Sequence, residues 1–200
     1  MVGGGIYSTA CEIHTYNLKV HNNSSYFGGG FYLHDSYCVF DFGTEIYENT
    51  GYNGGAFYVC GKTDYYANNI KIHDNWAICR QNISEHEVTY TGGLGAVIST
   101  NRESPQRDPG PQNPCTASFT NCEIYSNTAE ICGGVGHNDG FCGMNFTGCN
   151  IHDNIAENKY SADVTGGAFD NYGNLDIDHC VVDNNTASLK SISYGGAIAN

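Results

Sequence analysis

The sequence predicts an all-β solenoid of parallel strands with about seven coils, and three observations carry this prediction. A tetrapeptide ending in asparagine recurs six times, and it reads IHDN both at 72–75 and at 151–154. No segment shows helical periodicity over three turns, and glycine supplies 26 of the 200 residues, which disfavours helices. Glycine pairs open a segment at seven places: Gly3, Gly28, Gly54, Gly92, Gly133, Gly166 and Gly195.

The spacing between these two signals defines the repeat. The first glycine and the closing asparagine are 20, 21, 21, 35, 21 and 19 residues apart in the first six segments. The uninterrupted unit is therefore about 25 residues long, which is too short to bury an apolar face of its own, so each unit must stack on its neighbours. With strands about 4.8 Å apart, seven coils make a rod on the order of 30 Å long.

The fourth segment is longer than the others because of one run, NRESPQRDPGPQNP at 101–114. This run holds all four prolines of the chain and two of its three arginines, and it predicts an inserted surface loop. Apart from this loop, residues 1–200 are expected to form a single solenoid segment.

Alternation within the repeat predicts which side chains face inward. Because side chains two apart share a face of a strand, the positions three and five before each closing asparagine form the core wall. The column five before it is Leu18, Thr44, Ile70, Cys122, Cys149 and Cys180. The column three before it, the core file, is Val20, Ile46, Ile72, Ile124, Ile151 and Val182.

The column between them must point outward, and it carries His21, Tyr47, His73, Tyr125, His152 and Asp183. The closing asparagines are expected to stack at one corner, where each amide can bond the copies above and below. This predicted asparagine ladder comprises Asn23, Asn49, Asn75, Asn127, Asn154 and Asn185. The glycine pairs suit the opposite corner, where Cβ atoms would crowd the bending backbone.

The alternation of GGA-I/L/V with F-x-x-N resembles the repeat of polymorphic outer-membrane autotransporter passengers and related right-handed parallel β-helix proteins. GGAF at 54–57, GGAF at 166–169 and GGAI at 195–198 match the first motif. The second matches in spacing, with Ile or Val where that family has Phe. The resemblance covers nearly all of the chain and implies a right-handed parallel β-helix and an extracellular surface rod, often adhesive. Both motifs are structural, so fold is implied more strongly than function.

Composition predicts an oxidised, extracellular or cell-surface location, because the chain has ten cysteines and few lysines. Cys115 and Cys142 both stand 12 residues before their closing asparagine, so stacking would bring them within disulfide range. Cys11 and Cys38 stand 12 and 11 residues before their closing asparagines, and they are a second candidate pair. In the inward column of Cys122, Cys149 and Cys180, either two join or all are free thiols that act as small core residues. Five sequons offer glycosylation sites: Asn22, Asn23, Asn82, Asn145 and Asn184.

Charge and hydropathy exclude two classes of partner. A net charge of −13 disfavours nucleic acid and anionic membranes, and no apolar run reaches membrane-spanning length. The outward Tyr and His stripe could stack on surface glycans or proteins, although such rings also pack on one another between strands.

Catalysis and metal binding receive less support from the pattern, and no catalytic or metal residue is assigned. The chain has no C-x-x-C spacing, which disfavours a zinc site, and no cofactor is expected. The His–Asp pairs of IHDN obey the repeat, whereas a catalytic site should break it. The segment that departs from the repeat with the most closely spaced ionisable side chains is DIDH at 176–179, which could hold calcium or nothing.

The sequence therefore predicts a noncatalytic extracellular structural or adhesive rod. Neither end of the chain has the atypical repeat that normally caps a solenoid. Its expected partners are flanking coils of a longer repeat protein or copies of itself in a surface filament. The alternative is a carbohydrate-active β-helix enzyme, a polysaccharide lyase or glycoside hydrolase, in which acids such as Asp74, Asp153 and Asp183 would flank the glycosidic bond.

Overall fold

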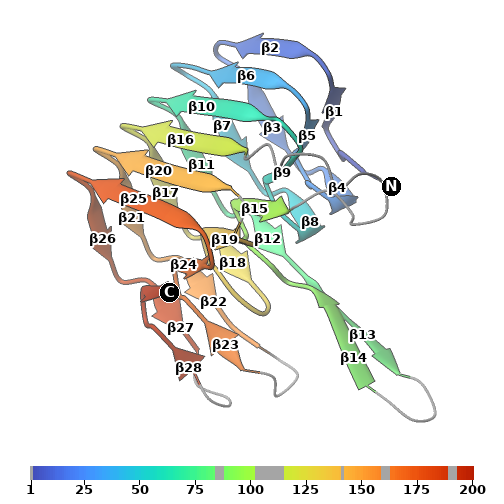
Figure 1. The fold of residues 1–200 in the computed structure, drawn as a ribbon, viewed down its shortest axis with the longest axis vertical. Helices are drawn as coiled ribbons and strands as arrows, with labels where there is room; N and C mark the ends of the chain where they lie inside the picture. The colour runs from blue at the N-terminus through green and yellow to red at the C-terminus, as the bar shows by residue number, and fades with distance from the viewer. Residues whose placement is uncertain (1, 84–87, 102–114, 141, 159–162, 189–192) are drawn as a thin grey trace.

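A computed structural model describes residues 2–83, 88–101, 115–140, 142–158, 163–188 and 193–200, and these residues form a parallel β-solenoid of about six turns. The described residues contain strands, turns and bends but no helix, so the predicted all-β fold class is confirmed. Successive coils lie on one another along the molecule, from the N-terminal coil to the C-terminal coil (Figure 1). One sheet has seven strands and three have six, so six coils are complete and a seventh begins.

Each coil contributes one strand to each of four sheets, which we number in chain order from the glycine corner. Sheet 1 contains β1 (Ile6–Thr9), β5 (Phe31–His34), β9 (Phe57–Cys60), β15 (Ile98–Asn101), β19 (Gly136–Asn138), β24 (Phe169–Asn171) and β29 (Ile198–Ala199). Sheet 2 contains β2 (Glu12–Thr15), β6 (Tyr37–Phe40), β10 (Asp64–Asn68), β16 (Thr116–Thr120), β20 (Gly143–Thr147) and β25 (Asn174–Asp178).

The shorter strands form the other two sheets. Sheet 3 contains β3 (Lys19–His21), β7 (Glu45–Tyr47), β11 (Lys71–His73), β17 (Glu123–Tyr125), β21 (Asn150–His152) and β26 (Val181–Asp183). Sheet 4 contains β4 (Ser24–Phe27), β8 (Thr50–Asn53), β12 (Trp76–Ala77), β18 (Thr128–Ala129), β22 (Ile155–Ala156) and β27 (Thr186–Ala187). Beside it, β23 (Val164–Thr165) pairs in parallel with β28 (Ser193–Tyr194).

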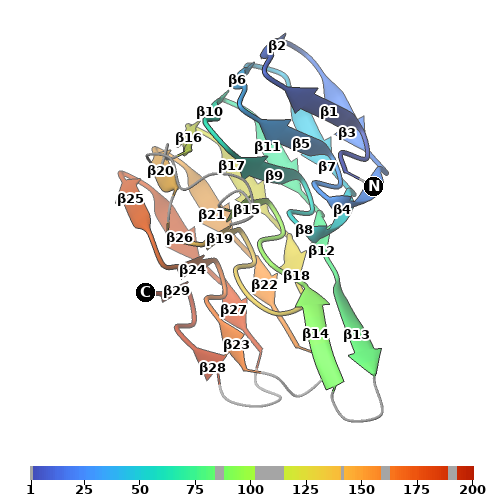
Figure 2. The same ribbon diagram turned by 45° about the vertical axis from the view of Figure 1, so that its right-hand side comes forward.

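The register of sheet 3 places equivalent residues of successive coils directly opposite one another. Ile72 pairs with Ile46 on one side and with Ile124 on the other, and the same register continues to Val20 and Val182 at the two ends. The stacking is visible from a second direction in Figure 2. The core file therefore runs unbroken through the six complete coils.

Aromatic rings from sheets 1 and 2 fill the rest of the core. Phe31 stacks on Phe57 with ring centroids 5.0 Å apart, and Phe119 stacks on Phe146 at 4.7 Å. All four rings are buried. In contrast, apolar residues of the first and last coils, such as Ile13 and Ile177, pack on the core but remain partly exposed because no further coil covers them.

Left-handed backbone conformations form the corners of each coil. At the corner between sheets 3 and 4, the residue before the ladder asparagine has φ between 52° and 57° in every coil, as at Asp74 and Asp153. Asp and Asn adopt this conformation more readily than most residues, which explains the third letter of IHDN. At the corner between sheets 4 and 1, glycine takes the same role, as at Gly54 with φ of 69°.

The glycine corner of the fourth coil differs from the prediction. Leu94 bridges to Asn53 and to Cys132, so Gly95, and not Gly92, is the equivalent of Gly54. Gly92 instead pairs with Cys79 in an antiparallel hairpin of β13 (Cys79–Ile83) and β14 (Val88–Gly92), which projects from the solenoid (Figure 1). The prediction that the GG pair at 92–93 opens the fourth coil is therefore wrong. This pair lies at the end of the hairpin, but its sequence is the same as that of the glycine pairs that open coils. Most of the predicted loop, 102–114, lies outside the described residues.

One of the two predicted disulfides is formed. Cys115 and Cys142 are bonded, with a Cα–Cα distance of 4.7 Å, and join the fourth and fifth coils. The Cys11–Cys38 prediction is wrong, because the register pairs Cys38 with Ile13 and leaves Cys11 two positions earlier, as a free thiol. Cys122, Cys149 and Cys180 are also free, and Cys122 and Cys149 are buried in the core.

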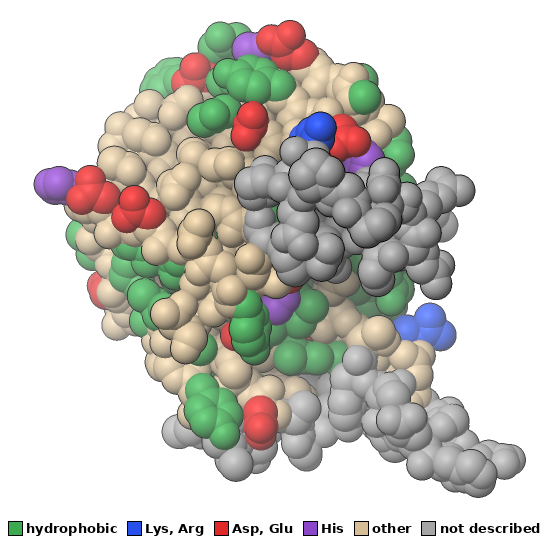
Figure 3. Space-filling model, in the orientation of Figure 1, with side chains coloured by type: hydrophobic (Ala, Val, Ile, Leu, Met, Phe, Trp, Pro, Cys, Tyr) green, Lys and Arg blue, Asp and Glu red, His purple; other side chains and the backbone are tan. Residues whose placement is uncertain are grey.

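The surface carries mainly acidic charge. Asp and Glu side chains are scattered over the face drawn in Figure 3, with few Lys or Arg among them. This distribution agrees with the net charge of −13. The described part of the chain contains no helix that is long and apolar enough to cross a membrane.

Candidate functional site

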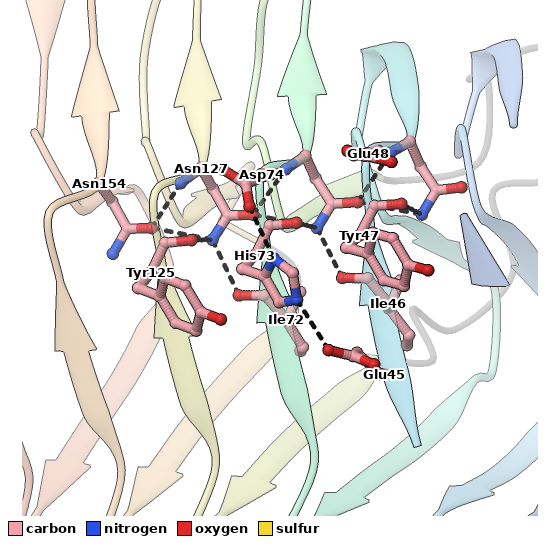
Figure 4. A network of polar contacts seen from close by, with 12 residues as sticks. Glu45, Ile46, Tyr47, Glu48, Ile72, His73, Asp74, Tyr125, Asn127 and Asn154 are labelled. Carbon is pink, nitrogen blue, oxygen red and sulfur yellow. Dashed lines mark hydrogen bonds and ion pairs between the residues drawn. The ribbon is translucent and has the colours of Figure 1, made fainter. Parts of the chain in front are cut away.

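The ladder asparagines lie one above another at the corner between sheets 3 and 4, and Figure 4 labels two of them, Asn127 and Asn154. The Nδ2 of each donates to the Oδ1 of the asparagine in the next coil, at 2.9 to 3.1 Å from Asn23 through to Asn185. The backbone N–H of each ladder residue from Asn23 to Asn154 also donates to that same Oδ1. The ladder therefore has a direction, with acceptors toward the N-terminal coil and donors toward the C-terminal coil.

The outward column of sheet 3 forms a second ladder, of aromatic rings. His21, Tyr47, His73, Tyr125 and His152 stack in that order, with centroids 4.7 to 5.4 Å apart and planes within 9° of parallel. Each inner ring has a neighbour on both faces, so the faces that could stack on a sugar are already covered. This packing favours a structural role for the column over carbohydrate binding.

The histidines of the two IHDN segments belong to the same ladder, and Figure 4 shows the first His–Asp pair, His73 with Asp74. His73 Nδ1 lies 2.7 Å from Asp74 Oδ2, and its Nε2 lies 3.2 Å from Glu45 Oε1 in the preceding coil. The pair of His152 and Asp153 repeats the first contact at 2.7 Å. Each letter of IHDN thus has a place in the repeat: core file, ring ladder, left-handed corner and asparagine ladder.

Glu45 predicts a pH dependence of stability. Its pKa is held below the ordinary value by a hydrogen bond from Lys19 and then by one from His73. A carboxylate whose pKa is lowered on folding stabilises the fold above its unfolded pKa, near 4.5, and this contribution is lost as the pH falls further. We expect Glu45→Gln to lower the urea midpoint at neutral pH and to flatten its decline below about pH 4.5.

Glu12→Gln is the matched control for this measurement. Glu12 lies on β2, its side chain is 69 % exposed, and it contacts only His14 among the charged residues that the structure describes. Its curve of urea midpoint against pH should follow that of the unmodified chain. Parallel curves for Glu45→Gln and the unmodified chain would contradict the role assigned to Glu45.

The predicted glycosylation sites differ in their surroundings. Asn22, Asn82 and Asn184 are exposed. Asn145 is half-buried and its Nδ2 lies 3.4 Å from the Ser118 hydroxyl. The amide of Asn23 is engaged in the asparagine ladder, so a glycan there would remove a ladder bond.

The DIDH segment lies at the C-terminal end of the solenoid. Asp176 and Asp178 are exposed on β25, and His179 Nδ1 is 2.7 Å from Asp178 Oδ1. Within the described residues, the one group of His, Cys and acidic ligand atoms close enough to share a metal ion lies elsewhere.

That group is Cys132, His137 and Asp170, which we call the corner cluster. Cys132 precedes a glycine corner, and His137 on β19 follows that corner on sheet 1. Asp170 occupies the position of His137 in the next coil. His137 Nδ1 lies 2.8 Å from Asp170 Oδ2 and 3.6 Å from Cys132 Sγ. Cys132 and Asp170 are buried, and the His137 side chain is 15 % exposed.

Hydrogen-bond donors surround the buried carboxylate of the cluster. Burial raises the pKa of Asp170, but hydrogen bonds from His137, Thr165 and Cys132 outweigh this and hold it below its ordinary value. Burial raises the pKa of the Cys132 thiol well above its ordinary value, and the Asp170 charge adds to the effect. Cys132 is therefore a protonated thiol.

This arrangement does not suit nucleophilic catalysis. A catalytic histidine uses one ring nitrogen for the nucleophile and the other for the orienting acid. Here the sulfur and the carboxylate both approach Nδ1 of His137. A raised thiol pKa also opposes formation of the reactive thiolate.

The corner cluster was not predicted from the sequence, because a metal site was tested for only by the C-x-x-C spacing. Its members are instead related by the repeat: Cys132 and His137 stand five apart across a glycine corner, as do Thr165 and Asp170 in the next coil. In the second and third coils the later of these two positions carries Tyr32 and Tyr58. Comparing this column across the repeats would have shown the change from tyrosine to the metal-ligand types histidine and aspartate.

No protein-family model, no curated protein and no solved structure matches this chain. The resemblance to polymorphic outer-membrane protein repeats therefore rests on the GGA motifs and on their spacing.

Proposed function

We propose that the chain is a noncatalytic structural rod of an extracellular surface, and that its end faces stack head to tail on further coils, which are flanking repeats of a longer protein or, in the purified chain, those of a second copy. The observation that carries this proposal is the complementarity of the two faces. The N-terminal face ends in the Oδ1 acceptor of Asn23. The C-terminal face ends in Asn185, whose Nδ2 donates to the Ile151 and Asp183 carbonyls in the way that the inner ladder amides donate to their equivalents, while each inner Nδ2 also donates to the next Oδ1.

The apolar residues of the two faces agree with this pairing. Two files of core residues run from one end face to the other. One ends in Ile13 and Leu175 and the second ends in Val20 and Val182, and each of these residues is less covered than its equivalents in the middle coils. The strands of both faces also present unpaired backbone groups, which template the addition of further strands. A second copy stacked in register would continue the core, the sheets and the asparagine ladder together.

The extracellular assignment is supported by the Cys115–Cys142 disulfide and by the exposure of Asn22, Asn82 and Asn184. Disulfides persist mainly in oxidising compartments. The ring ladder gives adhesion through sugar stacking less support, because its inner rings cover one another. Enzymatic use of the IHDN acids also gains little support, since Asp74 and Asp153 each pair with the histidine beside them.

Head-to-tail association predicts concentration-dependent oligomers of the purified chain, measured by sedimentation velocity and by electron microscopy. Ile198 lies on β29 at the C-terminal face and is 42 % exposed, so Ile198→Lys should place a charge in the interface and reduce the oligomers to monomers.

The matched control is Phe42→Lys, because Phe42 is 71 % exposed but belongs to the second coil, away from both faces. It should assemble as the unmodified chain does. A chain that stays monomeric at high concentration, or two variants that lose assembly equally, would overturn the head-to-tail arrangement.

A further inference from the structure

We propose that the corner cluster is a binding site for a divalent transition-metal ion of the zinc type, with Cys132 Sγ, His137 Nδ1 and an Asp170 carboxylate oxygen as ligands. The three ligand atoms lie within 4.8 Å of one another. This site is independent of the head-to-tail association proposed above, because it lies on sheet 1 and not on an end face.

The distances suit tetrahedral coordination. With bonds of about 2.0 to 2.3 Å to N, O and S, two ligand atoms of a tetrahedral zinc ion are about 3.3 to 3.7 Å apart. The sulfur and Nδ1 are already 3.6 Å apart. The Nδ1 to Oδ2 distance is 2.8 Å, because a hydrogen bond joins these atoms, and it must open by about 0.5 Å to admit the ion.

The donor set selects the class of metal. A thiolate, an imidazole and one carboxylate suit zinc and its neighbours in the first transition row, whereas calcium and magnesium require oxygen ligands. Three protein ligands leave a fourth position of a tetrahedral ion for water or another small ligand.

The protons and charges balance when the ion binds. The Cys132 thiol releases its proton to solvent, and His137 binds as the tautomer that carries its proton on Nε2, so that both ligand atoms have a free electron pair. The thiolate and the Asp170 carboxylate then neutralise the two positive charges of the ion. The Thr165 hydroxyl, which already donates to Asp170, would hold that carboxylate in place.

The position within the repeat agrees with a site and not with packing alone. Along this column of sheet 1, Tyr7 stacks on Tyr32 and Tyr32 on Tyr58, so aromatic rings cover the corner in the first three coils. At the fifth and sixth coils the column changes to His137 and Asp170, with Cys132 and Thr165 facing them. The fourth coil carries Ser99 in this column, so the rings end there, and the next two coils place three side chains with metal-ligand atoms together, with Thr165 bonded to one of them.

The test is a titration of the chain, with its Cys115–Cys142 disulfide intact, with Co²⁺ under anaerobic conditions, in a Cys11→Ser background that removes the exposed thiol. We expect saturation at one ion per chain, with the sulfur-to-cobalt charge-transfer band of a thiolate ligand and the visible bands of tetrahedral cobalt. Zn²⁺ should displace the cobalt and raise the melting temperature.

Variants separate this site from the other cysteines. Cys132→Ser should abolish the charge-transfer band, and Asp170→Asn should weaken binding at least about tenfold. Cys60→Ser is the matched control, since Cys60 is also a buried thiol on sheet 1, and it should bind as the background does. If Cys132→Ser does not fold, Asp170→Asn and His137→Gln decide the question by their affinities.

The proposal is overturned if Co²⁺ shows no saturable binding, or if Cys132→Ser retains the charge-transfer band. It is also overturned if Cys60→Ser loses the band as fully as Cys132→Ser does.

Discussion

Replacement of Gly54 by alanine is expected to destabilise the chain by about 2–5 kcal/mol. Gly54 has φ of 69°, and a Cβ built there would overlap the carbonyl oxygen of Phe57. The left-handed conformation alone costs an alanine about 1–2 kcal/mol, and displacing packed backbone adds about 1–3 kcal/mol. The measurement is urea unfolding followed by circular dichroism.

Gly143→Ala is the matched control, because nothing lies within 4 Å of a Cβ built at Gly143 on β20. Its stability should stay within about 0.5 kcal/mol of the unmodified chain. A loss of similar size in both variants would show that the cost belongs to glycine in general and not to the corner.

Replacement of Asn127 by alanine is expected to cost about 3–4 kcal/mol. Asn127 is buried, and its Oδ1 accepts from the backbone N–H and the Nδ2 of Asn75, while its own Nδ2 donates to Asn154 and to the Ile72 carbonyl. Each buried partner left without its bond costs about 1–3 kcal/mol. Asn150→Ala, at an exposed position of β21, should change the free energy of unfolding by less than about 0.5 kcal/mol.

Asn127→Asp tests the direction of the ladder at the same site. An ionised carboxylate has no donor for Asn154 Oδ1, so this variant should be at least as destabilised as Asn127→Ala at neutral pH. The neutral acid can donate, so folding raises the pKa of this aspartate above its unfolded value of about 3.9. Relative to the unmodified chain, stability should therefore recover below about pH 4 and be lost as the pH rises. Equal losses at both pH values would contradict the assigned donor.

The repeat made the fold predictable from the sequence. Once Ile46, Ile72, Ile124 and Ile151 are recognised as one column, stacking follows, because no single unit can bury its apolar face. Sheet 3 then pairs these residues as expected. Register also explains the outcome for the cysteines. Cys115 and Cys142 have the same spacing to the closing asparagine, and they form the disulfide. For Cys11 and Cys38 this spacing differs by one residue, and in the sheet Cys38 pairs with the residue two positions after Cys11.

The corner cluster was harder to predict because its contacts cross a corner. Side chains on opposite sides of a strand corner can face each other outside the core, and alternation along one strand does not reveal this. The Cys132–His137 contact depends on how tightly the chain bends at Gly133, whose φ is 63°. The hairpin of β13 and β14 was missed for a related reason, since its glycine pair imitates the signal that opens a coil.

That hairpin bears on how such a chain can change during evolution. It leaves the solenoid after Ala77 and rejoins it at Leu94, yet Ala77 stays paired with Ala129, and Leu94 stays bridged to Asn53. Lengthening a loop whose ends are already held together costs free energy only logarithmically in its length. Extra segments can therefore be acquired at a corner without disturbing neighbouring coils, which lets new surface features arise and diversify while the scaffold is inherited unchanged.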